Sequence, residues 1–168
     1  MKYLKVAVAA LFAAASVMTG GTALAQDDSS QQNPILQFDS MTPVTGAAVG
    51  TVNDRGIIGG GKPWVITSGS GEVDRDGSVH VSVSGLVIPV APFNGTNPVA
   101  AFGATVSCIT PHGIVNVRTG TAPASPAGDA TIDGTVTLPH PCKDPILFVT
   151  SPGGAWFAMS NAEDEETD

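Results

Sequence analysis

The chain has 168 residues, a formal net charge of −8, 20 glycines and 13 prolines. That density of Gly and Pro excludes long helices, because an interior proline costs a helix about 3 kcal/mol and a glycine about 1 kcal/mol. The acidic balance also argues against nucleic acid and anionic membrane surfaces as partners, since both require clustered Lys and Arg.

The first 25 residues have the pattern of a signal peptide. Lys2 and Lys5 provide a positive start, residues 6–18 form an apolar core, and Ala23-Leu24-Ala25 matches a small-x-small cleavage site. The apolar core is shorter than the roughly twenty residues that span a bilayer. We therefore expect cleavage after Ala25, a secreted or periplasmic location, and no membrane span in the mature chain.

Removal of this segment leaves five of the seven basic residues against all fifteen acidic ones, a net charge of −10. Residues 26–37 are polar and are expected to form a linker. Residues 38–160 have the length of a single β-domain. Residues 161–168 contain five acidic residues and are expected to form a disordered tail.

The segment 56–62 fits the first seven positions of a phosphate-binding loop, G-x-x-x-x-G-K. Pro63 then replaces the Ser or Thr that ligates magnesium, and 64–67 is aromatic and β-branched, which predicts a strand. A phosphate loop requires a helix at this point. The glycines therefore predict a turn with positive φ that leads into a strand, and no nucleotide or other cofactor is expected.

Period-two alternation of apolar and polar residues predicts strands with one wet face at 78–84 and 130–138, and a third apolar row at 102–108. The segments 146–149 and 155–159 are apolar throughout. A Ser-Pro-Gly-Gly turn separates them, so they are expected to form a buried hairpin.

Roughly eight such segments, separated by turn signals at 74–77 and 110–113, predict an all-β fold. The expected architecture is an antiparallel β-sandwich with immunoglobulin-like or jelly-roll-like topology.

Cys108 and Cys142 are the two cysteines of the chain. Outside the cytosol such a pair usually oxidises, so a disulfide is predicted. With a separation of 34 residues, it is expected to contribute about 3–4 kcal/mol. The alternative is a structural metal site formed by the two thiols with His112 and His140. Their spacing does not favour it, and no metal is expected.

No catalytic residue is predicted, because the sequence has no G-x-S-x-G motif and its histidines are expected on a strand's polar face, in a turn and in a loop: His80, His112 and His140. The alternative is a secreted hydrolase that uses a carboxylate pair from the Asp54 loop and the Asp74–Asp76 turn. The same turn leaves a weak calcium site open. An EF-hand is excluded, because Gly85 stands at its twelfth position.

Four short motifs stand out along the mature chain: PWVI (63–66), GLVIP (85–89), LPHPC (138–142) and SPGGAWFA (151–158). Together they resemble a family of small exported bacterial β-proteins to which no activity is assigned. The resemblance covers the whole mature domain, and its most specific part is the SPGGAWFA ending. It implies a secreted β-domain with paired cysteines and carries no catalytic or binding residue to this chain.

These observations favour a non-enzymatic binding or envelope-associated module, with an envelope polymer or a protein as its ligand. Residues that could form loop contacts are Trp64, Phe93, Asp74 and Asp76. Trp156 lies in an apolar run and is expected to pack in the core.

Overall fold

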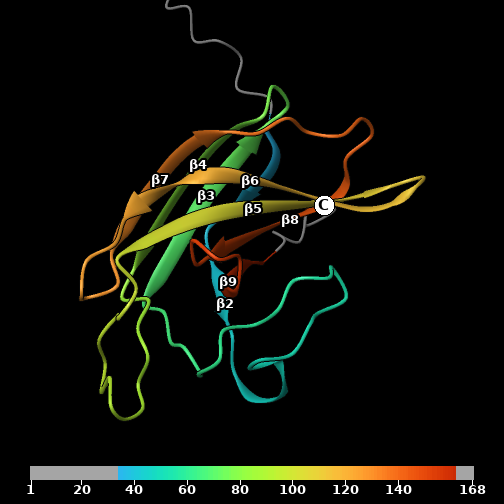
Figure 1. Cartoon of the computed structure of the whole chain (residues 1–168). Helices are drawn as coiled ribbons and strands as arrows, with labels where there is room; N and C mark the ends of the chain where they lie inside the picture. Colours follow the sequence, from blue (N-terminus) through green and yellow to red (C-terminus); the bar gives the residue numbers. More distant parts are fainter. Residues whose placement is uncertain (1–33, 162–168) are drawn as a thin grey trace, which may run out of the picture. The chain divides into compact units, whose positions relative to one another are not determined.

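The computed structural model describes residues 34–161, and within them nine strands form two antiparallel sheets (Figure 1). The prediction of an all-β antiparallel sandwich with one disulfide is confirmed, with nine strands where roughly eight were expected. The predicted signal peptide, residues 26–33 of the predicted linker and the acidic residues 162–168 lie outside the described residues.

The first sheet has four strands in the order β1-β3-β4-β7. Valines 79, 81 and 83 of β4 are buried and the polar residues between them are half-buried or exposed, as the alternation predicts. The outer face of this sheet is therefore polar and open. The bounds are β1 Pro34–Phe38, β3 Ser68–Asp74, β4 Ser78–Ser84 and β7 Ala130–Thr135.

The second sheet has five strands in the order β2-β9-β8-β5-β6. The predicted hairpin of two apolar strands is confirmed as β8 and β9. The bounds are β2 Met41–Pro43, β5 Ala101–Thr110, β6 Gly113–Pro123, β8 Lys143–Thr150 and β9 Trp156–Ser160.

Strand β5 is buried on both faces, which corrects the prediction of one wet face. Its apolar row from Phe102 to Cys108 faces the core as predicted. The alternate residues Thr105 and Ser107 are also buried, although they point to the opposite side of the sheet. The cause is a loop from elsewhere in the chain, described below, that covers this outer face.

The core between the sheets contains three aromatic rings in mutual contact. Trp64 stacks on Phe157 with ring centroids 4.1 Å apart, and both rings meet Phe102 edge to face. Trp64 is 2 % exposed, so it belongs to the core and not to a loop contact surface. The strand predicted at 64–67 is not present: of these residues only Val65 forms an isolated bridge, with Val87, although Trp64 is buried as an apolar residue.

The domain begins earlier than residue 38. Strand β1 starts at Pro34 and pairs with β3, and within it Leu36 is buried. The predicted linker included this short apolar strand because most of the residues before it are polar. At the other end, the backbone N–H of Asn161 donates to Ser40, so the ordered pairing includes the first residue of the predicted tail.

The predicted disulfide between Cys108 and Cys142 is present. It joins the buried face of β5 to the segment that leads into β8.

The two sheets approach each other closely where β7 of the four-stranded sheet passes β6 of the five-stranded sheet. A Cβ on Gly134 of β7 would come within 2.9 Å of Thr119 of β6, so this close approach requires glycine.

Candidate functional site

A loop of residues 50–60, which we call the covering loop, lies against the outer face of the five-stranded sheet. Backbone hydrogen bonds close it on itself from Gly50 to Gly60, and Gly56 takes the positive φ of +75° that the sequence predicts. At its base, Gly60 donates to Trp156 of β9. The loop is therefore a small ordered hairpin fixed to the sheet edge and has no helix after it.

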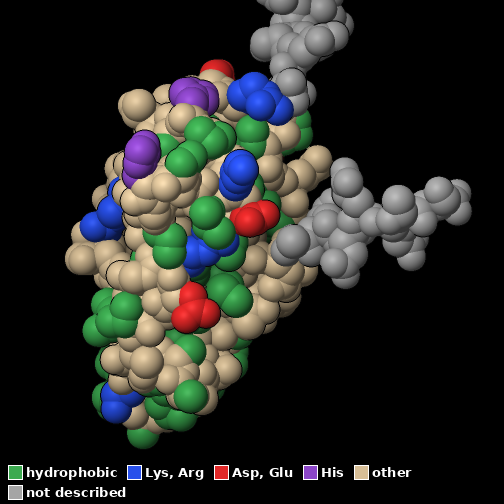
Figure 2. Space-filling model, turned by 90° about the vertical axis from the view of Figure 1, so that its right-hand side faces the viewer, with side chains coloured by type: hydrophobic (Ala, Val, Ile, Leu, Met, Phe, Trp, Pro, Cys, Tyr) green, Lys and Arg blue, Asp and Glu red, His purple; other side chains and the backbone are tan. Residues whose placement is uncertain are grey.

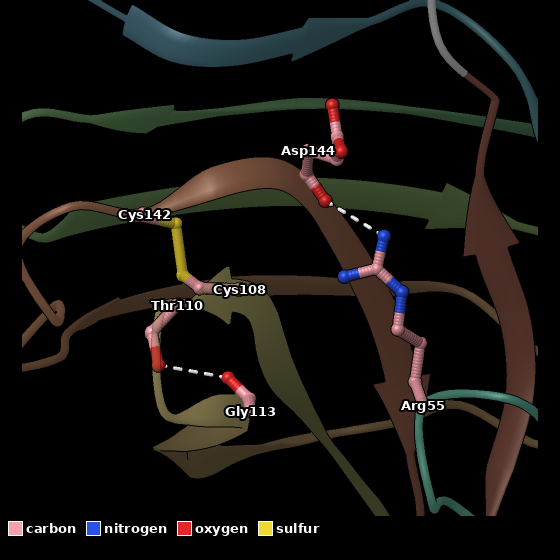
Figure 3. The surroundings of a disulfide bond; sticks show 6 residues. All are labelled: Arg55, Cys108, Thr110, Gly113, Cys142 and Asp144. Carbon is pink, nitrogen blue, oxygen red and sulfur yellow. Dashed lines mark hydrogen bonds between the residues drawn. A yellow bond between two sulfur atoms is a disulfide. The ribbon is translucent and has the colours of Figure 1, made fainter.

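Arg55 holds the tip of the covering loop to the sheet. Its backbone carbonyl accepts a hydrogen bond from Asn116 of β6, and its guanidinium donates to the carbonyl of Asp144 on β8 at 2.9 Å (Figure 3). Strand β5 lies between β6 and β8. The side chain of Arg55 therefore passes over β5.

Ser107 is the β5 residue in register with Asn116 on β6, and on β8 it lies opposite Ile146, two residues from Asp144. Thr105 follows on the same face, opposite Phe148. Both hydroxyl oxygens are buried and have no hydrogen-bond partner among residues 34–161. The layer beneath the covering loop thus contains polar groups in an otherwise apolar setting.

The hairpin of β5 and β6 extends past the other strands of the two sheets (Figure 1). Ile109 and Ile114 lie opposite each other near its turn and are 37 % and 45 % exposed. Among the described strands β6 pairs only with β5, and its other edge has no hydrogen-bonded partner strand, although β7 approaches it at Thr119. Residues 113–117 contain neither a charge nor a proline, the features that usually protect such an edge.

Charged residues flank this hairpin. Lys143 is in register with Ile109, and Arg118 of β6 donates to the carbonyls of Ser151 and Pro152. Figure 2 shows hydrophobic, basic and acidic side chains interspersed on the side from which the hairpin projects. This surface therefore combines aliphatic groups with charges of both signs.

The outer face of the four-stranded sheet carries a row of ionisable side chains. Glu72, His80 and Asp133 are cross-strand neighbours, and Nδ1 of His80 contacts a carboxylate oxygen of Asp133. Beside the row is a shallow groove of about 360 Å³, lined in part by Asp39 and Ser70. His80 and Asp133 are exposed, so this face resembles a solvated polar surface more than an enclosed site.

Asp129 organises the end of the same sheet. Its carboxylate accepts hydrogen bonds from the backbone N–H of Gly85 and from the hydroxyls of Ser84 and Ser125. The Gly85 N–H, with further contributions from the two serines, lowers the pKa of Asp129. This arrangement fixes a loop and leaves no free carboxylate for chemistry.

The other predicted contact residues have structural surroundings. Phe93 is half-buried and packs against the core. Asp74 is half-buried, and its Oδ1 has no hydrogen-bond partner in the described part of the chain. Asp76 is exposed; its carboxylate accepts the backbone N–H of Ser78, which lowers its pKa. Neither aspartate belongs to a metal-ligand cluster among residues 34–161.

The structure does not bring together the carboxylates of the hydrolase alternative. Asp54 lies in the covering loop on the five-stranded sheet, whereas Asp74 and Asp76 flank the β3–β4 turn of the other sheet. The metal alternative requires the thiols of Cys108 and Cys142 as ligands, but the two cysteines are joined in the disulfide. His140 lines a pocket of about 130 Å³ beside that disulfide, and His112 is exposed in the β5–β6 turn.

Residues that sequence reasoning missed are Arg55, Ser107 and Ile114. Arg55 precedes the glycine-rich segment that was compared with a phosphate-binding loop, and no role was predicted for it. Ser107 alternates with apolar residues, so it was expected on a solvent-exposed strand face. Only Ile114 could have been found from the sequence, because residues 113–117 form an uncharged, largely β-branched segment directly after a turn, a pattern that predicts an unprotected strand edge.

Within residues 34–161, no helix has the length and hydrophobicity that a membrane crossing requires. Comparisons of the chain with protein-family models, curated proteins and solved structures find no match.

Proposed function

We propose that the chain is a non-enzymatic binding module that recognises a protein by adding one of its extended segments to the open edge of β6. The observation that carries the proposal is the projecting β5–β6 hairpin with its exposed, uncharged edge. Edge strands of this kind accept a partner strand through main-chain hydrogen bonds.

The backbone of β6 has the geometry for strand addition. Thr110 and Gly113 close a two-residue turn, so they form a hydrogen-bonded pair. In the alternating antiparallel pattern, the N–H and C=O groups of Ile114 and Asn116 then point away from β5. These groups can pair with an incoming strand while Ile114 provides an apolar contact.

The exposed side chains favour a protein over an envelope polymer as the ligand. Within the described residues, the exposed large hydrophobic side chains are all aliphatic, and both tryptophans are buried. Sugar rings bind preferentially to exposed aromatic faces, which this surface does not offer. Lys143 and Arg118 beside the hairpin favour a partner segment with acidic residues.

We further place this activity outside the cytosol and the chain in the family of exported β-proteins that its motifs resemble. The N-terminal 25 residues and the disulfide both support an oxidising compartment.

The test compares Ile114→Lys with Thr131→Lys, which adds the same positive charge at an exposed strand residue of the other sheet. Both tagged proteins are added to envelope and culture-medium fractions, and bound proteins are quantified by mass spectrometry. We expect a partner that the wild type and Thr131→Lys retain and Ile114→Lys loses. Identical profiles for the three proteins would refute strand addition at β6.

A further inference from the structure

A pocket of about 130 Å³ lies beside the disulfide and is open on one side. Three separate parts of the chain form it: strand β1, the β3–β4 turn and the segment between β7 and β8. Its lining residues are Ile35, Arg75 and residues 138–142.

The inner wall of the pocket is apolar. Leu138 is buried, and the other residues of this wall are half-buried: Ile35, Pro139 and Cys142. An apolar cavity of about 150 Å³ holds a benzene ring, so a ring or a short aliphatic chain of similar size fits here and can project through the open side. Such a ligand gains by removing its apolar surface from water.

The rim of the pocket carries two side chains that can donate hydrogen bonds to an anion. Arg75 and His140 are both exposed, and both line the pocket. The guanidinium is permanently charged, and an imidazole has at least one ring N–H. No carboxylate lines the pocket: Asp74 and Asp76, the neighbours of Arg75 in the chain, are not among its lining residues.

The guanidinium of Arg75 is available for a ligand. Among residues 34–161 it forms no hydrogen bond or ion pair, whereas Arg55 and Arg118 donate to backbone carbonyls. A guanidinium presents its N–H groups in a planar fork that matches the two oxygens of a carboxylate. One permanent positive charge at the rim matches a ligand with one negative charge.

The wall that carries His140 is fixed by covalent structure. Cys142 is joined to Cys108, which is buried in β5 (Figure 3). The prolines on both sides of His140 restrict the backbone further, because each fixes its own φ. A pocket that is formed before the ligand arrives loses little conformational entropy on binding.

We propose that this pocket binds a small apolar carboxylate. The carboxylate accepts hydrogen bonds from the guanidinium of Arg75, with the ring N–H of His140 as a second donor, and the apolar part lies against Ile35 and Leu138. This site uses no residue of the β6 edge and takes a different class of ligand, so it goes beyond strand addition.

The experiment compares sodium benzoate with benzamide, which has the same ring and a similar shape but no charge. Each is titrated into ¹³C,¹⁵N-labelled protein at constant ionic strength, and NMR follows the methyl groups of Ile35 and Leu138 and the side-chain N–H of Arg75. We expect saturable shifts with benzoate and binding of benzamide at least about tenfold weaker. Equal affinity for the two, or no saturable shift with benzoate, would overturn the proposal.

Sodium acetate carries the charge without the ring. It is expected to bind at least about tenfold more weakly than benzoate, because it has almost no apolar surface to bury. Acetate that binds as tightly as benzoate would show an exposed arginine that attracts any anion, and would refute the pocket as the site.

An Arg75→Gln variant tests the charged contact. It is expected to weaken benzoate binding about tenfold and to leave benzamide binding unchanged. An equal loss for both probes would contradict a contact with the carboxylate. The matched control Lys62→Gln removes the same charge from an exposed residue that does not line the pocket and is expected to bind benzoate as the wild type does. Equal weakening in the two variants would reduce the effect to net charge and refute the assignment.

An Ile35→Ala variant tests the apolar wall. It is expected to weaken benzoate and benzamide several-fold to the same extent, because both rings lose the same contact. Unchanged affinity for benzoate would place the ring elsewhere and contradict the proposal.

Discussion

The two sheets are built from similar alternating sequences, yet their outer faces differ. In the four-stranded sheet, the outward residues of β4 are Ser and His, and they remain half-buried or exposed. In the five-stranded sheet, the outward Thr105 and Ser107 of β5 are buried beneath the covering loop. Alternation therefore decides which residues face the core, while a distant segment decides whether the other face meets water.

The largest expected effect compares one outward side chain from each sheet. Phe148 lies on the outer face of β8 but is 1 % exposed, and its ring contacts Trp156. Phe148→Ala is expected to lower the free energy of unfolding by about 3–5 kcal/mol. His80→Ala on the open face is expected to change it by less than about 1 kcal/mol. Urea unfolding of both variants measures the difference; equal effects would mean that both faces are equally open.

The disulfide fixes the entry to β8 on the covered sheet. Replacing both cysteines with alanine is expected to lower the free energy of unfolding by about 3–4 kcal/mol, chiefly because the unfolded chain gains freedom. Guanidinium unfolding of this variant, compared with the reduced wild type, measures the effect. A midpoint unchanged by either treatment would mean that the bond contributes nothing to stability.

The junction of the two sheets offers a matched pair of glycines. Gly134→Ala is expected to cost about 1–3 kcal/mol, because its Cβ would meet Thr119 at 2.9 Å. Gly120→Ala has no atom within 4 Å of the new Cβ and is expected to be neutral or to stabilise by up to about 1 kcal/mol. Thermal unfolding measures both, and a reversed order would show that β6 and β7 do not approach closely.

The smallest expected effect is the pH dependence of Asp129 on the open sheet. Hydrogen bonds from Gly85, Ser84 and Ser125 lower its pKa, so its contribution is present above the unfolded value of about 3.9. It is lost as the pH falls through the lower folded value. Asp129→Asn should therefore be less stable than the wild type at neutral pH, with the difference shrinking below about pH 4.

Stability measured from pH 7 to pH 2 tests this prediction. Asp54→Asn removes an equal charge and controls for the change in net charge. A difference between Asp129→Asn and the wild type that stays constant down to pH 2 would contradict the role of the carboxylate.

The sequence predicted those features that depend on neighbours along the chain. The valines of β4, the β8–β9 hairpin and the pairing of Cys108 with Cys142 all follow from alternation, turn residues and compartment. The covered face was not predictable, because the hydrogen bond between Arg55 and Asn116 joins residues 61 positions apart. For the same reason Ser107 was expected to be exposed to solvent, although its alternation with the core-facing residues of β5 was predicted correctly.

The short strand β1 and Trp64 show a second limit. Composition assigned residues 34–37 to a linker, yet three of these residues together with Phe38 pair with β3. Trp64 was a candidate loop contact as an aromatic residue, but its ring lies in the core, stacked on Phe157. In both places a few apolar residues next to turn formers decide the structure.

The central claim is that the covering loop shields the outer face of the five-stranded sheet, and Trp156 reports on it directly. Trp64→Phe leaves Trp156 as the single tryptophan, and acrylamide quenching of its fluorescence measures its exposure. Because Trp156 is 4 % exposed, the native protein should be quenched far less than the same protein unfolded in guanidinium. Native quenching as strong as that of the unfolded chain would contradict the account.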